Sequence, residues 1–229
     1  MFESVVLLSG GIDSALCLAM EVRRFGANRV VALSVSYGQS HRCELHSAQK
    51  LARRYQVEHR VITTLLPTSS GCVAGEVHRS VADNVSSAYV PARNTVLLSL
   101  ALCCAESVGA QRIIIGATAA DSAGFPDCRH GYFRAWQTLA NVGTAVSERI
   151  RVHTPVIDMS KAQIGRACKS MGVPLELTWS CYHGGMRGGC VDGPEQCGEC
   201  DACVNRLKVM LAAGVDLTVK APFPDGATA

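Results

Sequence analysis

The sequence lacks a long hydrophobic run. No window approaches about eighteen unbroken apolar residues, so no transmembrane helix is predicted. A basic segment followed by an apolar stretch and a cleavage site is also missing at the start, so no signal peptide is predicted. An excess of charge of either sign is also lacking. The 22 Lys and Arg residues nearly balance the 19 Asp and Glu residues, which leaves a net charge of +3. Because nucleic-acid binders carry a far more basic surface, we expect no nucleic-acid partner. The lack of a transmembrane helix and of a signal peptide predicts a cytoplasmic protein without a membrane partner.

Two common phosphate-binding motifs are absent as well. The chain has no G-x-x-x-x-G-K-[ST], which excludes the lysine-bearing loop used for γ-phosphoryl transfer. It has no G-x-G-x-x-G, so the usual dinucleotide site is not supported. Any nucleotide site in this protein must therefore be of another kind.

The composition is typical of a folded domain. Of the 229 residues, 48% are hydrophobic and 18% are charged, which is enough to form a sizeable core. The length suits one α/β domain with a small appendage. The chain has 12 cysteines, and in a cytosolic protein clustered cysteines more often bind metal than form disulfides.

Short apolar segments alternate with helical patterns over the first two-thirds of the chain. Strands are predicted at residues 5–8, 30–35, 59–62 and 113–115, and helices at 14–24, 44–55, 95–108, 132–142 and 161–171. This alternation predicts an α/β fold: a Rossmann-like open parallel sheet with helices on both faces, over residues 1–178. After Trp179 the composition becomes rich in Gly and Cys and ends in a helix at about 204–213. Residues 179–229 are therefore predicted to form a small zinc-binding helical subdomain.

The string S-G-G-I-D-S at residues 9–14 lies between the first strand and the first helix. Gly10 and Gly11 let backbone N–H groups approach phosphate oxygens, and the following helix adds its positive end. Asp13 would repel phosphate, which makes sense if it holds a Mg²⁺ ion that bridges the phosphates. The alternative is that Asp13 and Ser14 only cap a helix, but the complete string favours a nucleotide site.

Three cysteines, Cys197, Cys200 and Cys203, follow one another at intervals of three residues. A tetrahedral zinc site needs a fourth ligand, for which Cys181 and Cys190 are the nearby candidates. The same spacing also suits an iron–sulfur cluster. Four thiolates leave no open position for water, so zinc here is expected to be structural rather than catalytic.

Polar residues follow three of the predicted strands or begin a helix. In an open α/β sheet the ligand-binding cleft lies at the carboxyl ends of the strands, so these residues are candidates for the site. Arg93 at a helix start is electrostatically misplaced unless an anion is positioned there. Asp127 could accept N–H donors of a purine-like amidine edge, and Arg129 could pair with a carboxylate. Cys128 is either a nucleophile or a packed thiol, and His41 either a proton shuttle or an ordinary loop residue. The candidate substrate residues are Tyr37, Gln39, His41, Arg93, Asn94, Asp121, Asp127, Cys128 and Arg129.

Together these motifs resemble the 7-cyano-7-deazaguanine synthases of the queuosine pathway, within the pyrophosphate-loop ATP hydrolases. The matching strings are S-G-G-I-D-S-A-L-C-L, Y-G-Q-S-H, V-P-A-R-N, D-S-A-G-F-P-D-C-R, T-W-S-C-Y and C-G-E-C-D-A-C, in the family's order. The resemblance implies an ATP site formed by Leu8, Ser9, Gly10, Gly11, Ile12, Asp13, Ser14, Ala15, Leu16, Cys17 and Leu18, with Mg²⁺. It implies zinc held by Cys181, Cys197, Cys200 and Cys203, and a homodimer.

The resemblance also implies a reaction. The carboxylate of 7-carboxy-7-deazaguanine attacks the α-phosphorus of ATP, and ammonia displaces AMP to give the amide. A second adenylation, on the amide oxygen, then allows loss of AMP to the nitrile. Asp13, Arg93, Asp127 and Arg129 are the residues expected to act in catalysis, by positioning and charge stabilisation.

The chain departs from the family at several positions. Ala15 and Leu16 stand where the family usually has two threonines, and Ser40 and Ala92 replace an arginine and a glycine. The stretch from Cys181 to Cys197 is longer than usual and includes Cys190. Three alternatives therefore stay open: a tRNA-thiolating enzyme, a relative that stops at the amide or takes another deazapurine, and a non-catalytic nucleotide-binding module.

Overall fold

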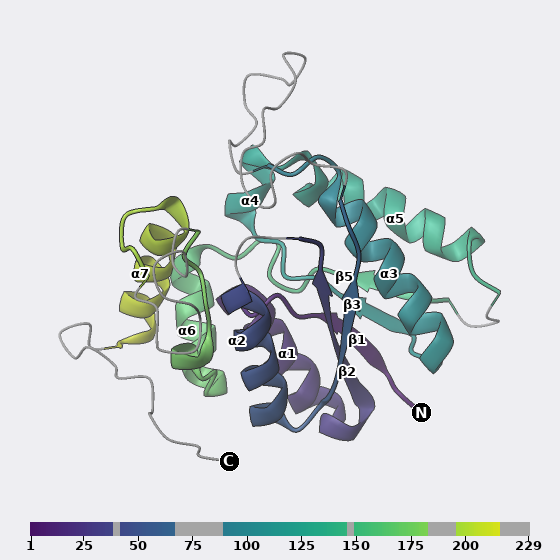
Figure 1. Ribbon diagram of the computed structural model, residues 1–229, viewed down its shortest axis with the longest axis horizontal. Helices are drawn as coiled ribbons and strands as arrows, with labels where there is room; N and C mark the ends of the chain where they lie inside the picture. The colour runs from purple at the N-terminus through teal and green to yellow at the C-terminus, as the bar shows by residue number, and fades with distance from the viewer. Residues whose placement is uncertain (39–41, 67–88, 146–148, 183–195, 216–229) are drawn as a thin grey trace.

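A computed structural model describes residues 1–38, 42–66, 89–145, 149–182 and 196–215 of the chain. Its centre is a five-stranded parallel sheet in the order β3-β2-β1-β4-β5, and Figure 1 shows helices on both of its faces. The strands are β1 (Ser4–Leu7), β2 (Val30–Ser36), β3 (Glu58–Thr63), β4 (Arg112–Ile114) and β5 (Arg151–His153). The α-helices are α1 (Ile12–Phe25), α2 (Arg42–Tyr55), α3 (Arg93–Val108), α4 (Ala119–Gly124), α5 (His130–Val142), α6 (Lys161–Met171) and α7 (Asp201–Ala213). Short 3₁₀ turns lie at Ala27–Arg29, Pro126–Cys128 and Leu175–Leu177.

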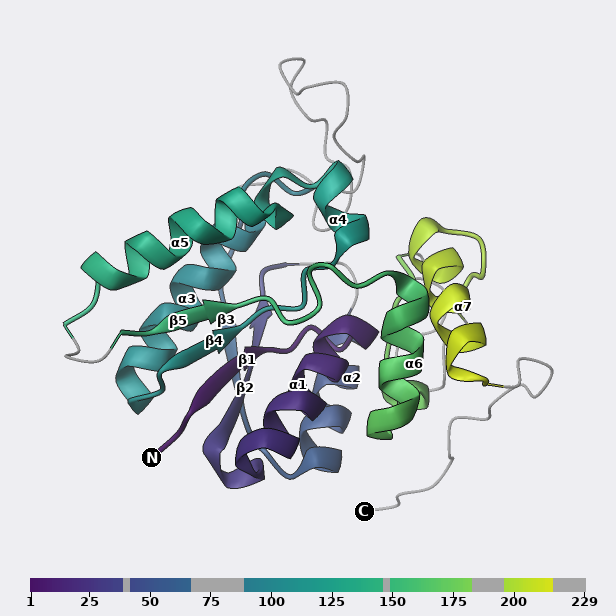
Figure 2. The same cartoon turned by 180° about the vertical axis from the view of Figure 1, so that it is seen from behind.

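Alternation along β1 explains why the sheet is covered on both sides. Val5 and Leu7 pack with residues of α3 and α5, whereas Val6 and Leu8 pack with residues of α1, α2 and α6. All four side chains are buried. Figure 2, seen from behind, shows the same separation of α1, α2 and α6 from α3 and α5. The predicted open parallel sheet with two covered faces is thus confirmed.

A shifted helix start and two unexpected elements show where the sequence patterns were weak. The predicted strands and helices all occur, and α3 begins two residues earlier than expected, at Arg93. Strand β5 and helix α4 are not expected from the sequence patterns. Strand β5 has only 3 residues, two of them cationic or titratable, and none is buried. Helix α4 has 6 residues and no buried position, so neither element carries an apolar period.

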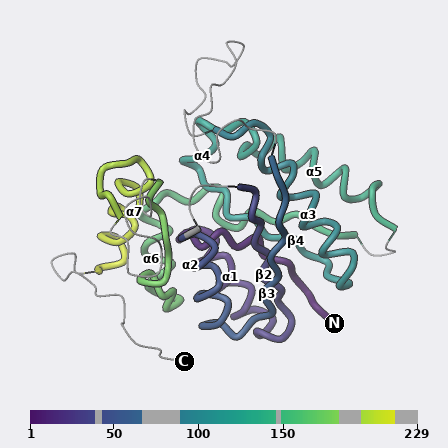
Figure 3. The backbone as a smooth tube through the Cα atoms, in the orientation of Figure 1, coloured from purple at the N-terminus to yellow at the C-terminus, as the bar shows by residue number. Residues whose placement is uncertain are grey.

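Helix α7 packs closely on α6, as the backbone trace in Figure 3 shows. Val209 and Ala213 of α7 lie in the same hydrophobic cluster as α1 and α6. Gly165 of α6 makes this contact close: a Cβ there would overlap the carbonyl oxygen of Val209 and lie 2.8 Å from the Cβ of Ala212. The division into residues 1–178 and 179–229 stays a prediction, because the last described helix shares the core of the sheet domain. Among the described residues, no helix is both long enough and apolar enough to cross a bilayer.

Gly165→Ala should lower the free energy of unfolding by about 1–3 kcal/mol, because the added methyl group forces α6 and α7 apart. Urea denaturation followed by circular dichroism would measure it. Gly131→Ala in α5 is the matched control, since its Cβ would meet only the end of the Arg134 side chain at 3.8 Å. The control should be neutral or stabilising by up to about 1 kcal/mol. Equal effects of the two substitutions would contradict the close α6–α7 contact.

Candidate functional site

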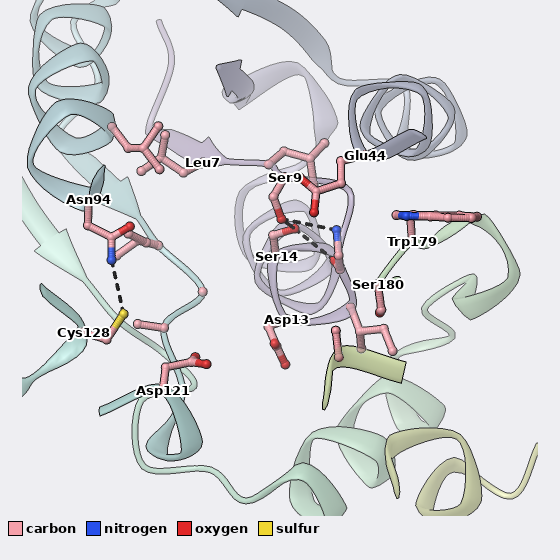
Figure 4. Close-up of a pocket in the computed structure, with 18 of the residues that line it drawn as sticks. Leu7, Ser9, Asp13, Ser14, Glu44, Asn94, Asp121, Cys128, Trp179 and Ser180 are labelled. Carbon is pink, nitrogen blue, oxygen red and sulfur yellow. Dashed lines mark hydrogen bonds between the residues drawn. The ribbon is translucent and has the colours of Figure 1, made fainter. Parts of the chain in front are cut away.

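A cavity of about 330 Å³ opens at the carboxyl ends of the central strands. Its walls come from the ends of β1 and β2 and from the first turns of α1, α2, α3 and α6. Helix α7 closes one side with Ala202, Asn205, Arg206 and Val209. In Figure 4, Asn94 and Cys128 lie on one side of the cavity, and Trp179 and Ser180 on the other. This is the position at which open α/β sheets bind ligands.

The phosphate-loop string forms a tight turn between β1 and α1. Gly10 has a φ of +90°, and a Cβ there would overlap the carbonyl oxygen of Glu44 in α2. The Ser14 hydroxyl donates to the Gly11 carbonyl at 3.0 Å and lies 3.1 Å from the Ser9 hydroxyl, as Figure 4 shows. Because α1 begins at Ile12, its free backbone N–H groups lie at this turn. The turn can therefore hold an anion.

Only part of the predicted nucleotide string lines the cavity. The lining residues from that string are Leu8, Ser9, Gly11, Ile12, Asp13 and Ser14. Gly10 lies behind the loop against α2, and Ala15, Leu16, Cys17 and Leu18 are fully buried in the core. Ala15 and Leu16, at which the chain departs from the expected motif, therefore have side chains packed in the core. Their role in nucleotide binding stays a prediction.

Asp13 lies at the first turn of α1 and forms an ion pair with Lys161 of α6, with 3.0 Å between Oδ2 and Nζ. The second oxygen, Oδ1, is buried, and in the described part of the chain it has no hydrogen-bond partner. Burial raises the pKa of the Asp13 carboxyl, the Lys161 ammonium lowers it, and nearby Asp121 raises it again. A buried carboxylate oxygen without a partner fits a Mg²⁺ ligand, since that ion prefers oxygen.

Lys161 is a site residue that the sequence analysis did not single out. It is the first residue of α6, directly after the capping residue Ser160. A cation is unfavourable at a helix start, and this is the same signal that drew attention to Arg93. The signal was available for both residues, but only the structure shows that Lys161 lies against Asp13.

The start of α3 brings several of the predicted substrate residues together. The Arg93 guanidinium lines the cavity and donates to the Tyr37 hydroxyl at 3.3 Å. The Asn94 backbone N–H donates to the Asp127 carboxylate at 2.9 Å, and its side-chain amide donates to the Asp127 carbonyl at 2.9 Å. The Asn94 amide also lies 3.2 Å from the Cys128 sulfur, as Figure 4 shows. The structure thus brings Tyr37, Arg93, Asn94 and Cys128 together.

Asp127 and Arg129 lie apart from the cavity. The buried Asp127 carboxylate is occupied by the backbone at the start of α3, and neither residue belongs to the cavity lining. Arg129 is exposed and donates to the Ser122 carbonyl at 3.2 Å. Asp121 lines the cavity, but one carboxylate oxygen accepts from the Thr118 backbone and hydroxyl at 2.8 Å each. The roles predicted for Asp127 and Arg129 stay predictions.

Cys128 is a buried thiol in the cavity wall. Burial, followed by the charges of Asp127 and Asp121, raises its pKa to about 12. A thiol with this pKa is protonated at neutral pH and is a weak nucleophile. Together with its burial and its contact with the Asn94 amide, this favours a packed thiol over a nucleophile for Cys128. Gln39, His41 and Cys190 lie outside the described residues.

The four cysteines of the predicted zinc set converge beside the cavity. The sulfurs of Cys181, Cys197, Cys200 and Cys203 all lie within 4.8 Å of one another, and those of Cys197 and Cys203 are 3.9 Å apart. Tetrahedral zinc with bonds of about 2.3 Å requires neighbouring sulfurs about 3.8 Å apart, so the set fits the ion. Backbone N–H groups of Cys200 and Glu199 lower the pKa of Cys197 to about 6, which favours the thiolate that a metal needs.

The cysteine cluster also fixes the cavity wall. Cys200 precedes the first residue of α7, and Cys203 is in its first turn. On the inner face of the helix, Arg206 donates to the Thr178 hydroxyl at 2.6 Å and to the Leu175 carbonyl at 2.9 Å. The sequence analysis predicted this helix but not its place in the cavity. That place follows from long-range contacts between residues 175–181 and 197–206.

Comparison with known proteins adds a second kind of evidence. The model of the family described as "Queuosine biosynthesis protein QueC" matches residues 3–214. The chain belongs to the QueC family. Its relatives include proteins named 7-cyano-7-deazaguanine synthase from Thermoplasma acidophilum, with 38% identity over 93% of this chain and 89% of the relative, and from Anaeromyxobacter sp., with 42% identity over 93% of each. The relative from Ralstonia pickettii is 43% identical over 93% of this chain and 96% of its own length.

Solved structures similar to this QueC family member are more distant. An NH₃-dependent NAD synthetase from Campylobacter jejuni has 19% identity and a TM-score of 0.45, covering 76% of this chain and 66% of its own. The U34-tRNA thiolase NcsA from Methanococcus maripaludis, solved with its [4Fe-4S] cluster, has 12% identity and a TM-score of 0.49, covering 76% and 58%.

Cys200→Ser should remove bound zinc and lower the melting temperature, because the cluster loses one of four ligands and α7 loses its anchor. Elemental analysis and differential scanning calorimetry would measure both. Cys103→Ser, at an exposed position outside the cluster, is the control. Unchanged metal content and melting in Cys200→Ser would refute a structural zinc site. A brown protein with visible absorbance would indicate an iron–sulfur cluster and favour the tRNA-thiolating alternative.

Proposed function

We propose that this protein is an ATP-dependent ligase that converts 7-carboxy-7-deazaguanine and ammonia to 7-cyano-7-deazaguanine. One observation carries the proposal: a chain of the QueC family places an S-G-G-x-D-S turn and a cluster of polar residues around the same cavity. Its relatives at 38–43% identity are named for the synthesis of that nitrile. The family and the cavity together favour the same chemistry.

ATP is proposed to bind with its phosphates at the turn formed by Ser9, Gly11 and Ser14. Backbone N–H groups at the start of α1 and the serine hydroxyls are the donors available there. The Lys161 ammonium, 3.0 Å from Asp13, supplies a positive charge at the same place. Asp13, with its unpartnered Oδ1, is the residue proposed to hold Mg²⁺, which would neutralise charge on the phosphates.

The reaction needs an activated oxygen twice. The substrate carboxylate attacks the α-phosphorus, pyrophosphate leaves, and ammonia replaces AMP at the acyl carbon with loss of a proton. The amide oxygen then attacks the α-phosphorus of a second ATP with release of pyrophosphate, and loss of AMP and the two N–H protons leaves the nitrile. The residues of this chain would act by holding the two reactants in line and by stabilising charge, with Arg93 as the cation beside the substrate.

Zinc is proposed to have a structural role. The four sulfurs of the cluster would complete the coordination of the ion, which leaves no position for a reacting water. Its effect on the reaction would be indirect, through the place of α7 in the cavity wall. A homodimer, which the family resemblance implies, stays a prediction that a mass measurement in solution would test.

Incubation of the protein with 7-carboxy-7-deazaguanine, ATP, Mg²⁺ and ammonia should yield the nitrile and two AMP for each substrate consumed. Mass spectrometry of the products distinguishes the outcomes. Accumulation of the amide with one AMP would indicate a variant that stops half-way. Absence of AMP with every component present would contradict the proposal and favour a non-catalytic nucleotide-binding module.

Asp13→Ala should reduce AMP formation by at least about 100-fold, because the phosphates lose their proposed metal ligand and Lys161 loses its partner. AMP release would be measured by chromatography, with the far-ultraviolet circular dichroism spectrum as evidence of folding. Asp158→Ala is the control, since that carboxylate is 80% exposed and pairs only with His130 in the described residues. Turnover retained in folded Asp13→Ala would refute the role of Asp13.

A further inference from the structure

Three carboxylates line the cavity in the part of the chain that the structure describes: those of Asp13, Glu44 and Asp121. Two of them are engaged in other contacts. Asp13 pairs with Lys161 at the phosphate turn, and Asp121 accepts two hydrogen bonds from Thr118 at the start of α4. Asp127, the carboxylate that the sequence pattern indicated for substrate recognition, is held by the backbone of Asn94 outside the lining. Among the described residues, Glu44 is therefore the remaining carboxylate of the cavity lining.

We propose that Glu44 determines specificity by accepting hydrogen bonds from the two adjacent N–H donors of a guanine-like ring, its ring N–H and its exocyclic amine. The inference rests on the proposed function, because it assumes a deazaguanine acid as the substrate. A carboxylate has two acceptor oxygens and no donor, so it matches two neighbouring donors and rejects an edge that presents a lone pair.

The backbone around Glu44 is fixed by close packing. Its carbonyl oxygen lies against Gly10 at the phosphate turn, where no side chain could fit. Its neighbours Cys43 and Ala48 are buried in α2. Figure 4 shows Glu44 next to Ser9, on the cavity side of α2. A ligand held by Glu44 would thus lie in the same cavity as a nucleotide bound at the phosphate turn, as a reaction between the two requires.

The nearby Arg93 guanidinium favours the ionised, accepting form of Glu44, whereas burial has the larger effect and raises the pKa of its carboxyl. Hydrogen bonds from two N–H groups of a ligand would favour the ionised form, and in a buried cavity such bonds are stronger than in water. Within the described residues, no other side chain donates a hydrogen bond to the Glu44 carboxylate.

The test compares the deazaguanine acid with its analogue lacking the exocyclic amine, in the wild type and in Glu44→Gln. The wild type should prefer the parent acid by about 10- to 100-fold in kcat/KM for AMP formation. In Glu44→Gln this preference should fall below about 3-fold, while KM for ATP stays unchanged, because an amide presents a donor in place of one acceptor. Glu58→Gln, on the exposed edge strand β3, is the matched control and should keep the wild-type preference.

Two outcomes would overturn the proposal. Unchanged selectivity in Glu44→Gln would show that the residue does not contact the amine. A fall in kcat for both acids by the same factor would show that Glu44 acts on the chemistry or on Arg93 instead. Should Glu44→Gln fail to fold, the wild type provides an independent measurement: equal affinity for the parent acid, the analogue without the amine and a ring-N-methylated acid would refute any acceptor for that edge.

Failure of this inference and failure of the proposed function are distinguishable. If the wild type forms no AMP with the parent acid, the proposed function is wrong. If it forms AMP but Glu44→Gln keeps the wild-type selectivity, only the role of Glu44 is wrong.

Discussion

The close contact between the phosphate turn and α2 depends on a single missing side chain. Gly10 has a positive φ and lies against the backbone of Glu44 and Ala48, with the Ala48 nitrogen 2.9 Å from the place of a Cβ. On its other side, the Gly10 carbonyl accepts a hydrogen bond from the Trp179 backbone N–H at 2.9 Å. One residue thus joins the turn to α2 and to the segment that leads into the cysteine cluster.

From this contact the arrangement of the cavity follows. Helix α2 brings Glu44 beside Ser9, and the segment around Trp179 brings Cys181 to the cysteines that precede and begin α7. The close approach of α6 to α7 at Gly165 then sets Arg206 and Asn205 on the cavity side. The cysteine cluster and the nucleotide turn therefore belong to one packed unit. A substitution in the cluster would shift α7 and so alter the cavity wall.

Sequence patterns predicted the parts of this protein that depend on neighbours along the chain. The apolar periods gave the helices and strands, because a buried strand or an amphipathic helix needs a local pattern. The three cysteines with three-residue spacing and the S-G-G-x-D-S turn are likewise local signatures. The short elements β5 and α4 were not predicted, because they bury too little surface to need a periodic pattern of apolar residues. The positions of Lys161 and Glu44 in the cavity could not be predicted from the sequence. A single charged residue in a helix is usually on the solvated surface, and only its neighbours in space show otherwise.

The order of residues along the chain specifies a parallel α/β sheet, a phosphate turn after the first strand and a thiol cluster near the end. Each of these depends on residue types at fixed short spacing. Only the tertiary structure decided which carboxylates face the cavity, that Asp127 is held by α3 and Asp13 by Lys161, and that α7 completes the wall. Those facts rest on contacts between residues far apart in sequence, such as the 148 positions between Asp13 and Lys161, and no local pattern records such a distance.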